Sequence, residues 1–456
     1  MIYRIYAQKD TFITNERYGS LPQTGSNFGS CEILHLHKKT GNSGMQGWAA
    51  SSSLSRILTK FDLVGIQNLL NSKSINQSSV KFFLHLSDAR HDKTLPSSFD
   101  VEVQALTQDW DEGKGFDVDT FADKGFANWD KAKSNVSWTV TGSQGSGSIS
   151  NYHFDSGHED LDCDVTDIVY SWLNGQTNNG FVIKLSSSQE QDLNDYYIKM
   201  FHSKQTFFKD KRPYLEARFD DSIKDDRNNF FFDVEGNLYI RNIIKGNLQN
   251  IQSIGTGSIG VSISDASGTV LTVTGSHAGQ TGLYSASFTI PFSSYSGSTF
   301  FDTWFDLNST SSVFFTGSFT VQKQNPVSNN TDKRYYCNVV NLRDAYYIDE
   351  VPKLKLFVRP HDYNPARVLT ASLSAKGQVI NNAYFSVINE RTGQEVIPWG
   401  TGSQQETRLS YDENGNYFTF HMSNLSQGNV YRLKFLFNED GQTRILNDNS
   451  FKFRVI

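Results

Sequence analysis

The composition predicts an all-β protein with several domains. Aromatic residues make up 13% of the 456 residues, with 34 Phe and 20 Tyr, whereas charged residues make up only 20%. Aromatic and β-branched side chains favour strands, and the frequent Gly, Ser and Asn clusters between them favour turns. A chain of this length exceeds a single hydrophobic core. We therefore expect an N-terminal jelly-roll-like β-sandwich over residues 1–220, followed by two immunoglobulin-like β-sandwiches over residues 229–323 and 331–456.

Alternation of apolar and polar residues places the strands of the first sandwich. The first strand runs from Ile2 to Ala7, with Ile2, Arg4 and Tyr6 on one side. Further strands are expected at residues 10–14, 32–36, 55–63, 80–86, 99–106, 181–185, 197–202 and 212–217. Phe61 is expected to belong to the core that these strands enclose.

One short helix is expected between two of these strands, in the segment DVTDIVYSWLNGQTNNG that starts at residue 164. Its apolar residues recur at three- and four-residue spacing and would share one face: Ile168, Val169, Trp172 and Leu173. Thr166 or Asp167 is the predicted N-cap, and Gly175 the predicted end. We expect Val169 and Trp172 to plug an open end of the first sandwich, which is a packing role without chemistry.

The second and third sandwiches are predicted from strand-length segments separated by turn signals at intervals of roughly ten residues. In the third sandwich these segments are residues 353–359, 368–374, 384–389, 417–422, 430–438 and 451–456. Residues 220–228 are interpreted as a charged, weakly structured hinge and residues 324–330 as a second linker. Thr-Gly-Ser triplets that begin at residues 141, 256, 274, 316 and 401 are interpreted as turns between strands.

Short motifs in residues 1–220 resemble, in their order, the DNRLRE-type domain. They are Asp10-Thr11-Phe12-Ile13, Asn27-Phe28-Gly29-Ser30, Arg56 to Leu63, Val80 to Leu86, Trp110-Asp111-Glu112 with Trp129, Asp164 to Phe181, and Arg212 to Glu216. The resemblance implies a β-sandwich related to transforming-growth-factor-β propeptides and to some carbohydrate-binding modules. Members of that family occur in secreted bacterial enzymes, surface proteins and phage-like particles, usually as binding or structural modules. The resemblance therefore implies a fold and leaves the activity open.

Charge, cysteine content and hydropathy exclude several classes of protein. A net charge of −6 and a pI near 5.9 provide no basic field for nucleic acid. Cys31, Cys163 and Cys337 lie far apart and suit buried thiols better than disulfides or a zinc site. Arg4 and Lys9 interrupt the only apolar patch at the N-terminus, so no signal peptide is expected. No apolar run has the length of a membrane span, and we expect no membrane insertion and synthesis in a host cytoplasm.

A polar cluster before the helix is a candidate cation site. Asp160, Asp162 and Asp164 alternate, so in an extended chain they would project from one side toward a structural Ca²⁺. The alternative is that these carboxylates favour the helix N-terminus without any ion. No other metal or cofactor is expected. Removal of calcium by a chelator, with the melting temperature as readout, distinguishes the two.

Large aromatic residues form the candidate ligand or partner surface. Trp110, Trp129 and Trp138, with Tyr152, would provide a platform for sugar rings if exposed, and core or interface anchors if buried. Nearby carboxylates, at positions 109, 111, 112 and 130, would be needed for a glycosidase, which requires a defined separation across a cleft. Because the sequence contains no Gly-x-Ser-x-Gly elbow, P-loop or His-Glu-x-x-His motif, we expect no catalytic residue and no enzyme activity.

The chain as a whole resembles virion proteins of tailed bacteriophages. The resemblance implies a non-enzymatic structural component of the particle, associated with its tail, neck or capsid. Its partners would be other virion proteins and further copies of itself in a homo-oligomer. The rival hypothesis is a carbohydrate-binding adhesin that recognises surface polysaccharide. The adhesin requires an exposed aromatic face between Trp110 and Trp138, whereas the structural hypothesis requires buried rings.

Overall fold

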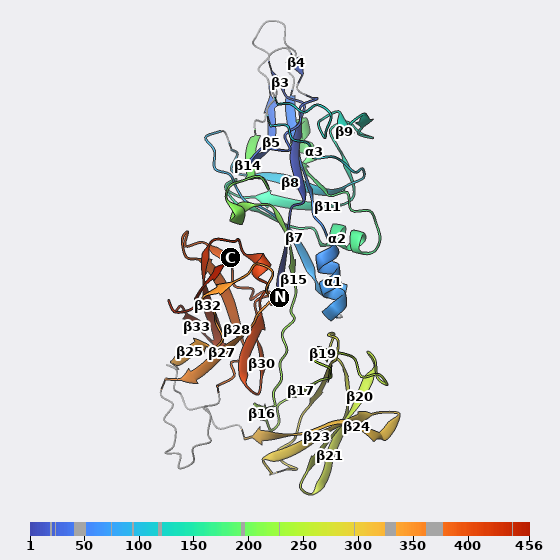
Figure 1. The fold of residues 1–456 in the computed structure, drawn as a ribbon, viewed down its shortest axis with the longest axis vertical. Helices are drawn as coiled ribbons and strands as arrows, with labels where there is room; N and C mark the ends of the chain where they lie inside the picture. Colours follow the sequence, from blue (N-terminus) through green and yellow to red (C-terminus); the bar gives the residue numbers. More distant parts are fainter. Residues whose placement is uncertain are drawn as a thin grey trace. The chain divides into compact units, whose positions relative to one another are not determined.

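A computed structural model describes residues 1–18, 21–22, 24–40, 52–73, 75–93, 95–116, 121–192, 197–227, 229–295, 297–323, 334–361, 377–439 and 441–456. Most of its regular structure is strand, which confirms the all-β prediction (Figure 1). Two compact units are present. The N-terminal unit holds residues 2–67 and 80–218, and the C-terminal unit holds residue 1, residues 68–79 and residues 219–456. The strand expected at 368–374 and the linker expected at 324–330 lie outside the described residues.

Two antiparallel sheets form the sandwich of the N-terminal unit. The smaller sheet has the order β1 (Ile2–Tyr6), β15 (Tyr214–Arg218), β7 (Lys81–Leu86) and β12 (Leu161–Asp164). The larger has the order β11 (Gly145–Phe154), β8 (Phe99–Leu106), β13 (Phe181–Leu185), β6 (Ser52–Lys60), β5 (Ile33–Thr40) and β14 (Tyr197–His202), with β2 (Lys9–Thr14) beside β6. Two short hairpins accompany them: β3 (Arg17–Tyr18) with β4 (Leu21–Pro22), and β9 (Lys131–Lys133) with β10 (Val136–Ser137). Period-two burial along β7 turns Phe82, Leu84 and Leu86 into the core, as the alternation predicts.

The predicted helix is present as α2 (Thr166–Leu173), but its N-cap was predicted wrongly. Val165 occupies the cap position and makes no side-chain cap bond. The Thr166 hydroxyl is used elsewhere, because it donates to Asp164 Oδ1 at 2.5 Å and accepts the Phe82 N–H at 3.0 Å. Asp164 Oδ1 also accepts the Thr166 N–H at 3.0 Å. The carboxylate before the helix therefore provides an acceptor for one of the N–H groups that have no partner within the first turn.

The other helices were not predicted. They are α1 (Val64–Lys73) and α3 (Ser187–Gln191), with single turns η1 (Gln77–Ser79), η2 (Lys209–Lys211) and η3 (Met422–Asn424). A capping box between Ser186 and Gln189 starts α3. Within the described ranges, none of these helices is long and apolar enough to span a membrane.

A single curled sheet forms the first half of the C-terminal unit. Its order is β16 (Phe230–Phe231), β24 (Ser309–Gln322), β23 (Thr299–Asp306), β20 (Ser258–Asp265), β21 (Gly268–His277), β22 (Leu283–Phe288) and β17 (Gly236–Arg241). Only residues 232–235 separate β16 from β17, although these strands lie at opposite ends of the order, so the sheet must curl on itself. The rings of Phe230, Phe288 and Phe319 pack together inside it. A hairpin of β18 (Ile243–Ile244) and β19 (Asn247–Leu248) follows β17.

The second half of the C-terminal unit is a two-sheet sandwich. One sheet has the order β25 (Tyr335–Val339), β27 (Lys353–Pro360), β31 (Gly415–Thr419) and β30 (Ser410–Asp412). The other has the order β26 (Ala345–Tyr346), β34 (Lys452–Val455), β32 (Val430–Glu439), β28 (Ala383–Asn389) and β29 (Glu395–Ile397), with β33 (Gln442–Leu446) beside β32. Phe385 of β28 stacks on Phe418 of β31 at 4.6 Å, which joins the two sheets in one core.

The described part of the predicted hinge, residues 220–227, is bonded to the sandwich rather than weakly structured. Tyr411 of β30 donates its N–H to the Ile223 carbonyl at 2.9 Å and accepts the Asp225 N–H on its own carbonyl at 3.2 Å. The Tyr411 hydroxyl also donates to Asp226 Oδ1 at 2.9 Å. These bonds replace the water that a loose linker would bind, so the segment has a fixed path along β30.

Two smaller expectations also need correction. Thr-Gly-Ser triplets at residues 274 and 316 lie inside strands β21 and β24, not in turns. At Gly275 a Cβ would approach the Ser285 carbonyl to 2.6 Å, so the missing side chain permits close backbone packing. The cysteines are free, but only Cys163 is buried, whereas Cys31 and Cys337 are half-buried.

Candidate functional site

The three tryptophans of the candidate sugar platform are core residues. Trp110, Trp129 and Trp138 are only 0%, 9% and 6% exposed, and they share one apolar cluster of the N-terminal unit. The indole N–H of Trp110 donates to the Asn179 carbonyl at 3.0 Å, and that of Trp138 to the Asn128 carbonyl at 2.7 Å. The exposed aromatic face that the adhesin hypothesis requires is therefore not present at these positions, where the rings are buried as the structural hypothesis requires. Burial of an indole ring stabilises the fold more than its exposure does, provided that the indole N–H has a hydrogen-bond acceptor.

Tyr152 does not belong to that cluster. It lies on β11, is half-buried, and packs edge-on against Phe154 with ring centroids 4.9 Å apart. Its hydroxyl donates to the Asp160 carbonyl at 3.1 Å. Both the ring and the hydroxyl of Tyr152 thus contact other residues of the fold, and Tyr152 does not form a sugar platform with the three tryptophans.

The candidate calcium ligands do not converge. Asp162 accepts two contacts from the Arg218 guanidinium at 3.0 and 3.1 Å, and Asp164 is bonded to Thr166. Asp160 Oδ1 accepts the Asp88 N–H at 2.6 Å. No group of three or more His, Cys, Asp or Glu side chains in the described part of the chain is arranged to hold a metal ion. The calcium hypothesis is therefore wrong for these residues, because protein donors take the oxygens that an ion would need.

The carboxylates near Trp110 are held in ion pairs. Asp109 lies between Lys60 and Lys133, at 3.2 and 2.7 Å. Burial opposes ionisation, but hydrogen bonds from the two lysines lower the pKa of the Asp109 carboxyl to about 2. Glu112 accepts the Asp10 N–H at 2.7 Å and pairs with Lys204 at 2.7 Å. These carboxylates stabilise the insertion after β8.

The residues expected to plug the first sandwich contact its core. Val169 is fully buried and Trp172 is 7% exposed. The Trp172 ring lies 4.7 Å from the ring of Phe181, which in turn meets Phe61 edge-on at 6.0 Å. Helix α2, strand β13 and the residue that follows β6 thus contribute one ring each to an aromatic row in the core.

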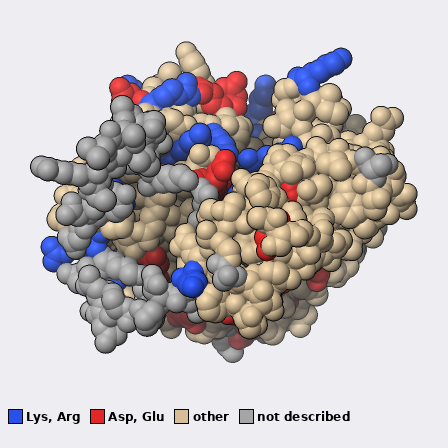
Figure 2. All heavy atoms as spheres, turned by 90° about the horizontal axis from the view of Figure 1, so that it is seen from below, with Lys and Arg blue, Asp and Glu red and all other residues tan. Residues whose placement is uncertain are grey.

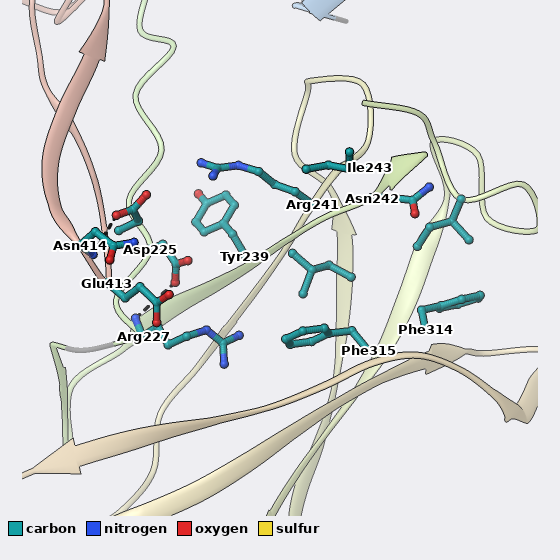
Figure 3. A pocket seen from close by; sticks show the side chains of 13 residues that line it. Asp225, Arg227, Tyr239, Arg241, Asn242, Ile243, Phe314, Phe315, Glu413 and Asn414 are labelled. Atoms are coloured by element: carbon teal, nitrogen blue, oxygen red, sulfur yellow. Dashed lines mark hydrogen bonds between the residues drawn. The ribbon is translucent and has the colours of Figure 1, made fainter. Parts of the chain in front are cut away.

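A cavity of about 390 Å³ in the C-terminal unit is lined by several charged side chains, including a carboxyl with a raised pKa (Figure 3). Asp225, Glu413 and Asn414 lie at one end, and the rings of Phe314 and Phe315 lie at the other. Two arginines, Arg227 and Arg241, contribute the cations. Sequence analysis missed this cavity because its residues come from five separate segments, and no local pattern joins them.

The pKa of Asp225 is the most perturbed among the carboxyls of this cavity. Burial raises it to about 7, the cation of Arg227 opposes the rise, and the charges of Asp412 and Asp226 add to it. A carboxyl that titrates near neutrality inside a cavity is a candidate acid or base. Its own Oδ1 accepts the Arg227 N–H at 3.2 Å.

The arginines of the cavity are already bound to other side chains. Arg227 makes two contacts of 2.8 Å with Asp302, a fully buried carboxylate. Arg241 donates to the Tyr417 hydroxyl at 2.6 Å. Bidentate and short contacts of this kind hold the guanidinium groups in place. The cavity thus lies between β17, β24 and β30, and its two arginines already bind other side chains. Asp225 is its one carboxyl with a strongly raised pKa.

Charges of both signs lie on one face of the molecule. On the face drawn in Figure 2, Lys and Arg side chains lie among Asp and Glu side chains, and most of that face carries neither. A continuous basic stripe is not seen on this face.

No family model and no curated protein matches this chain. Among solved structures, a titin Ig tandem is 8% identical over 50% of this chain and 91% of its own, with a TM-score of 0.15. Trypsin-activated alpha-2-macroglobulin from Escherichia coli is 9% identical over 90% of this chain and 23% of its own, with a TM-score of 0.15. Apo beta-glucuronidase 3 from Bacteroides uniformis is 8% identical over 77% of this chain and 39% of its own, with a TM-score of 0.16. Likenesses at such TM-scores carry no argument, and the fold class rests on the strands themselves.

Proposed function

We propose that this chain is a non-enzymatic structural component of a tailed-bacteriophage particle, associated with its tail, neck or capsid. It binds neighbouring proteins and further copies of itself through its β-sandwiches. The observation that carries the proposal is the exposed apolar hairpin, defined as residues 243–248, in the C-terminal unit. Ile243, Ile244 and Leu248 are 59%, 43% and 46% exposed.

The exposed apolar hairpin has little stability of its own. Two residue pairs hold its strands, Ile243 with Leu248 and Ile244 with Asn247, and two hydrogen bonds between Asn242 and Gln249 close its base. Isolated two-stranded hairpins are marginal in water, and clustered exposed aliphatic side chains mark contact surfaces. Docking against a partner would bury these side chains and support the hairpin.

The state of the polar residues also supports a structural role. The carboxylates near Trp110 are paired with lysines, and the arginines of the cavity are bound to Asp302 and Tyr417. Catalytic groups require geometry that leaves them available to a substrate. Two further features support the phage assignment. One is the resemblance of residues 1–220 described above, and the other is the turn-rich, all-β character of the chain.

Cryo-electron microscopy of native particles tests this function. The chain should occupy a fixed, symmetric position, with the exposed apolar hairpin buried against a neighbour. A particle assembled with Ile244→Asp and Leu248→Asp should lose the chain, while one carrying Ile445→Asp, an exposed aliphatic residue on β33, should retain it. Finding the protein free and monomeric, and absent from particles, refutes the proposal.

A further inference from the structure

A second pocket, of about 330 Å³, lies in the N-terminal unit beside α2. Its wall is built from the end of β8, the start of β11, one face of α2 and the loop that leads to β13. Ile168 and Trp172 of α2 provide the apolar part. All other side chains that line it are neutral, and most carry a hydroxyl or an amide. This volume is at the lower end for small-molecule sites and suits one or two sugar rings.

A β-bulge opens the pocket. The pairing of β11 with β8 is regular from Ile149 onward but shifts between Ser146 and Ile149, so Gly147 and Ser148 leave the ladder. Gly147 has a φ of +81°, a conformation that favours glycine. Bulges often stand beside binding sites because they redirect side chains away from the sheet. Here the bulge exposes Ser146 and Ser148 at the edge of the pocket.

Asn179 is the polar residue that points to a ligand. It is only 8% exposed and lines the pocket, yet its side-chain amide makes no hydrogen bond with any residue that the structure describes. Its neighbour Asn178 differs, since that amide donates to the Phe61 carbonyl at 2.8 Å and accepts the Gly180 N–H at 3.0 Å. The Asn179 amide atoms are not among the fully buried polar atoms that lack a partner, so they keep access to the space that a ligand in the pocket would fill. An amide of this kind can both donate to and accept from a ligand hydroxyl.

The rim of the pocket offers further free polar groups. Thr107, Gln176 and Thr177 are exposed, line the pocket and make no side-chain hydrogen bond to other described residues. The backbone under them is fixed, because the Gln176 N–H donates to the Ser171 carbonyl at 3.0 Å and the Asn179 carbonyl accepts from Trp110. Fixed backbone with free hydroxyl and amide ends is a preorganised arrangement for a ligand.

We infer that this pocket binds a neutral saccharide, with Asn179 and Gln176 as its hydrogen-bonding residues and Trp172 as part of its apolar floor. An ionic ligand would find no counter-charge among the lining residues, and a purely apolar one would leave the Asn179 amide without a partner. A sugar ring combines hydroxyl groups that donate and accept with apolar C–H faces. The inference does not depend on the role proposed above.

Glycan-array screening of the full chain, followed by calorimetry with the best neutral oligosaccharide on the array, tests this inference. Asn179→Ala and Gln176→Ala should each weaken binding by about tenfold, the effect of one lost hydrogen bond to a ligand. Gln176 is exposed, so its variant keeps the test valid if Asn179→Ala fails to fold. Asn151→Ala, on an exposed part of β11 outside the pocket, is the matched control and should bind like the wild type.

Three outcomes overturn the inference. They are the absence of any neutral glycan bound at millimolar concentration, unchanged affinity in both pocket variants, and binding of peptides or charged glycans in preference to neutral ones.

Discussion

Asp10 is a buried carboxyl whose removal should stabilise the protein in a pH-dependent way. It lies on β2 and is 1% exposed. Its Oδ2 accepts the Lys204 N–H at 2.5 Å. Burial raises the pKa of the Asp10 carboxyl to about 7, and the charge of Glu112 adds to the rise, whereas Lys204 and Arg212 oppose it. Asp10→Asn keeps the shape and removes the charge.

The sign of the effect follows from the two pKa values. In the unfolded chain the Asp10 carboxyl ionises near its ordinary pKa of 3.8, and in the folded chain near 7. Above the folded pKa the wild type carries the cost of a buried charge, and below the unfolded pKa it does not. Each pKa unit corresponds to about 1.4 kcal/mol, so the cost reaches at most ~4 kcal/mol near pH 8. The Asn variant should therefore be more stable by a margin that shrinks as the pH falls.

Urea unfolding followed by tryptophan fluorescence measures this margin. Wild type and Asp10→Asn are compared between about pH 5 and about pH 8. The comparison uses the difference between the two proteins, because half-buried His35 and buried His37, whose pKa values desolvation lowers, make both proteins less stable as the pH falls. Asp225, with its pKa of about 7, also titrates in both.

Asp109→Asn is the matched control. The pKa of the Asp109 carboxyl is about 2, so this group stays ionised throughout the range, and the stability difference from wild type should not change with pH. A stability difference for Asp10→Asn that is the same at both ends of the range would refute the argument that burial shifts this carboxyl.

Three further predictions concern packing and ion pairs. Arg227→Ala removes the cation beside the buried Asp302 carboxylate, which keeps the hydrogen bond from Trp304 Nε1 at 2.8 Å, and should lower the free energy of unfolding by about 3–5 kcal/mol. A loss below ~1 kcal/mol in urea titration would show that the ion pair is dispensable. Trp172→Ala should cost about 3–5 kcal/mol through the cavity left beneath α2, and a normal thermal midpoint for that variant would contradict its packing role. Chelation of calcium should leave the melting temperature unchanged, because Arg218 occupies Asp162; a clear drop would restore the calcium hypothesis.

Most strands could be predicted because their information is local. In β8 and β14 the observed bounds, Phe99–Leu106 and Tyr197–His202, coincide with the predicted ones. Helix α2 was found for the same reason, since its apolar residues recur at helical spacing. Strand β11 (Gly145–Phe154) was missed, because its first residues, Gly-Ser-Gly-Ser, have low strand propensity. It is a strand because β8 supplies a hydrogen-bonding edge.

The candidate sites were much less predictable than the strands. Trp110 and Trp138 were recognised as important from their residue type alone, but their exposure depends on where the insertion after β8 folds. The partner of Asp162 is Arg218, which is distant in sequence and reaches it across the small sheet. Sequence spacing predicts which residues share a face of one element, and it does not predict what that face meets.

The sequence by itself determined the all-β class, the positions of most strands and the amphipathic helix α2, because side-chain periodicity acts over a few residues. Only the tertiary structure decided which polar groups are satisfied. Asn178 and Asn179 are adjacent and chemically identical, yet one bonds to the Phe61 carbonyl and the other lines a pocket without a partner. Burial and hydrogen bonding are properties of the packed neighbourhood, and that neighbourhood is assembled from segments far apart in the chain.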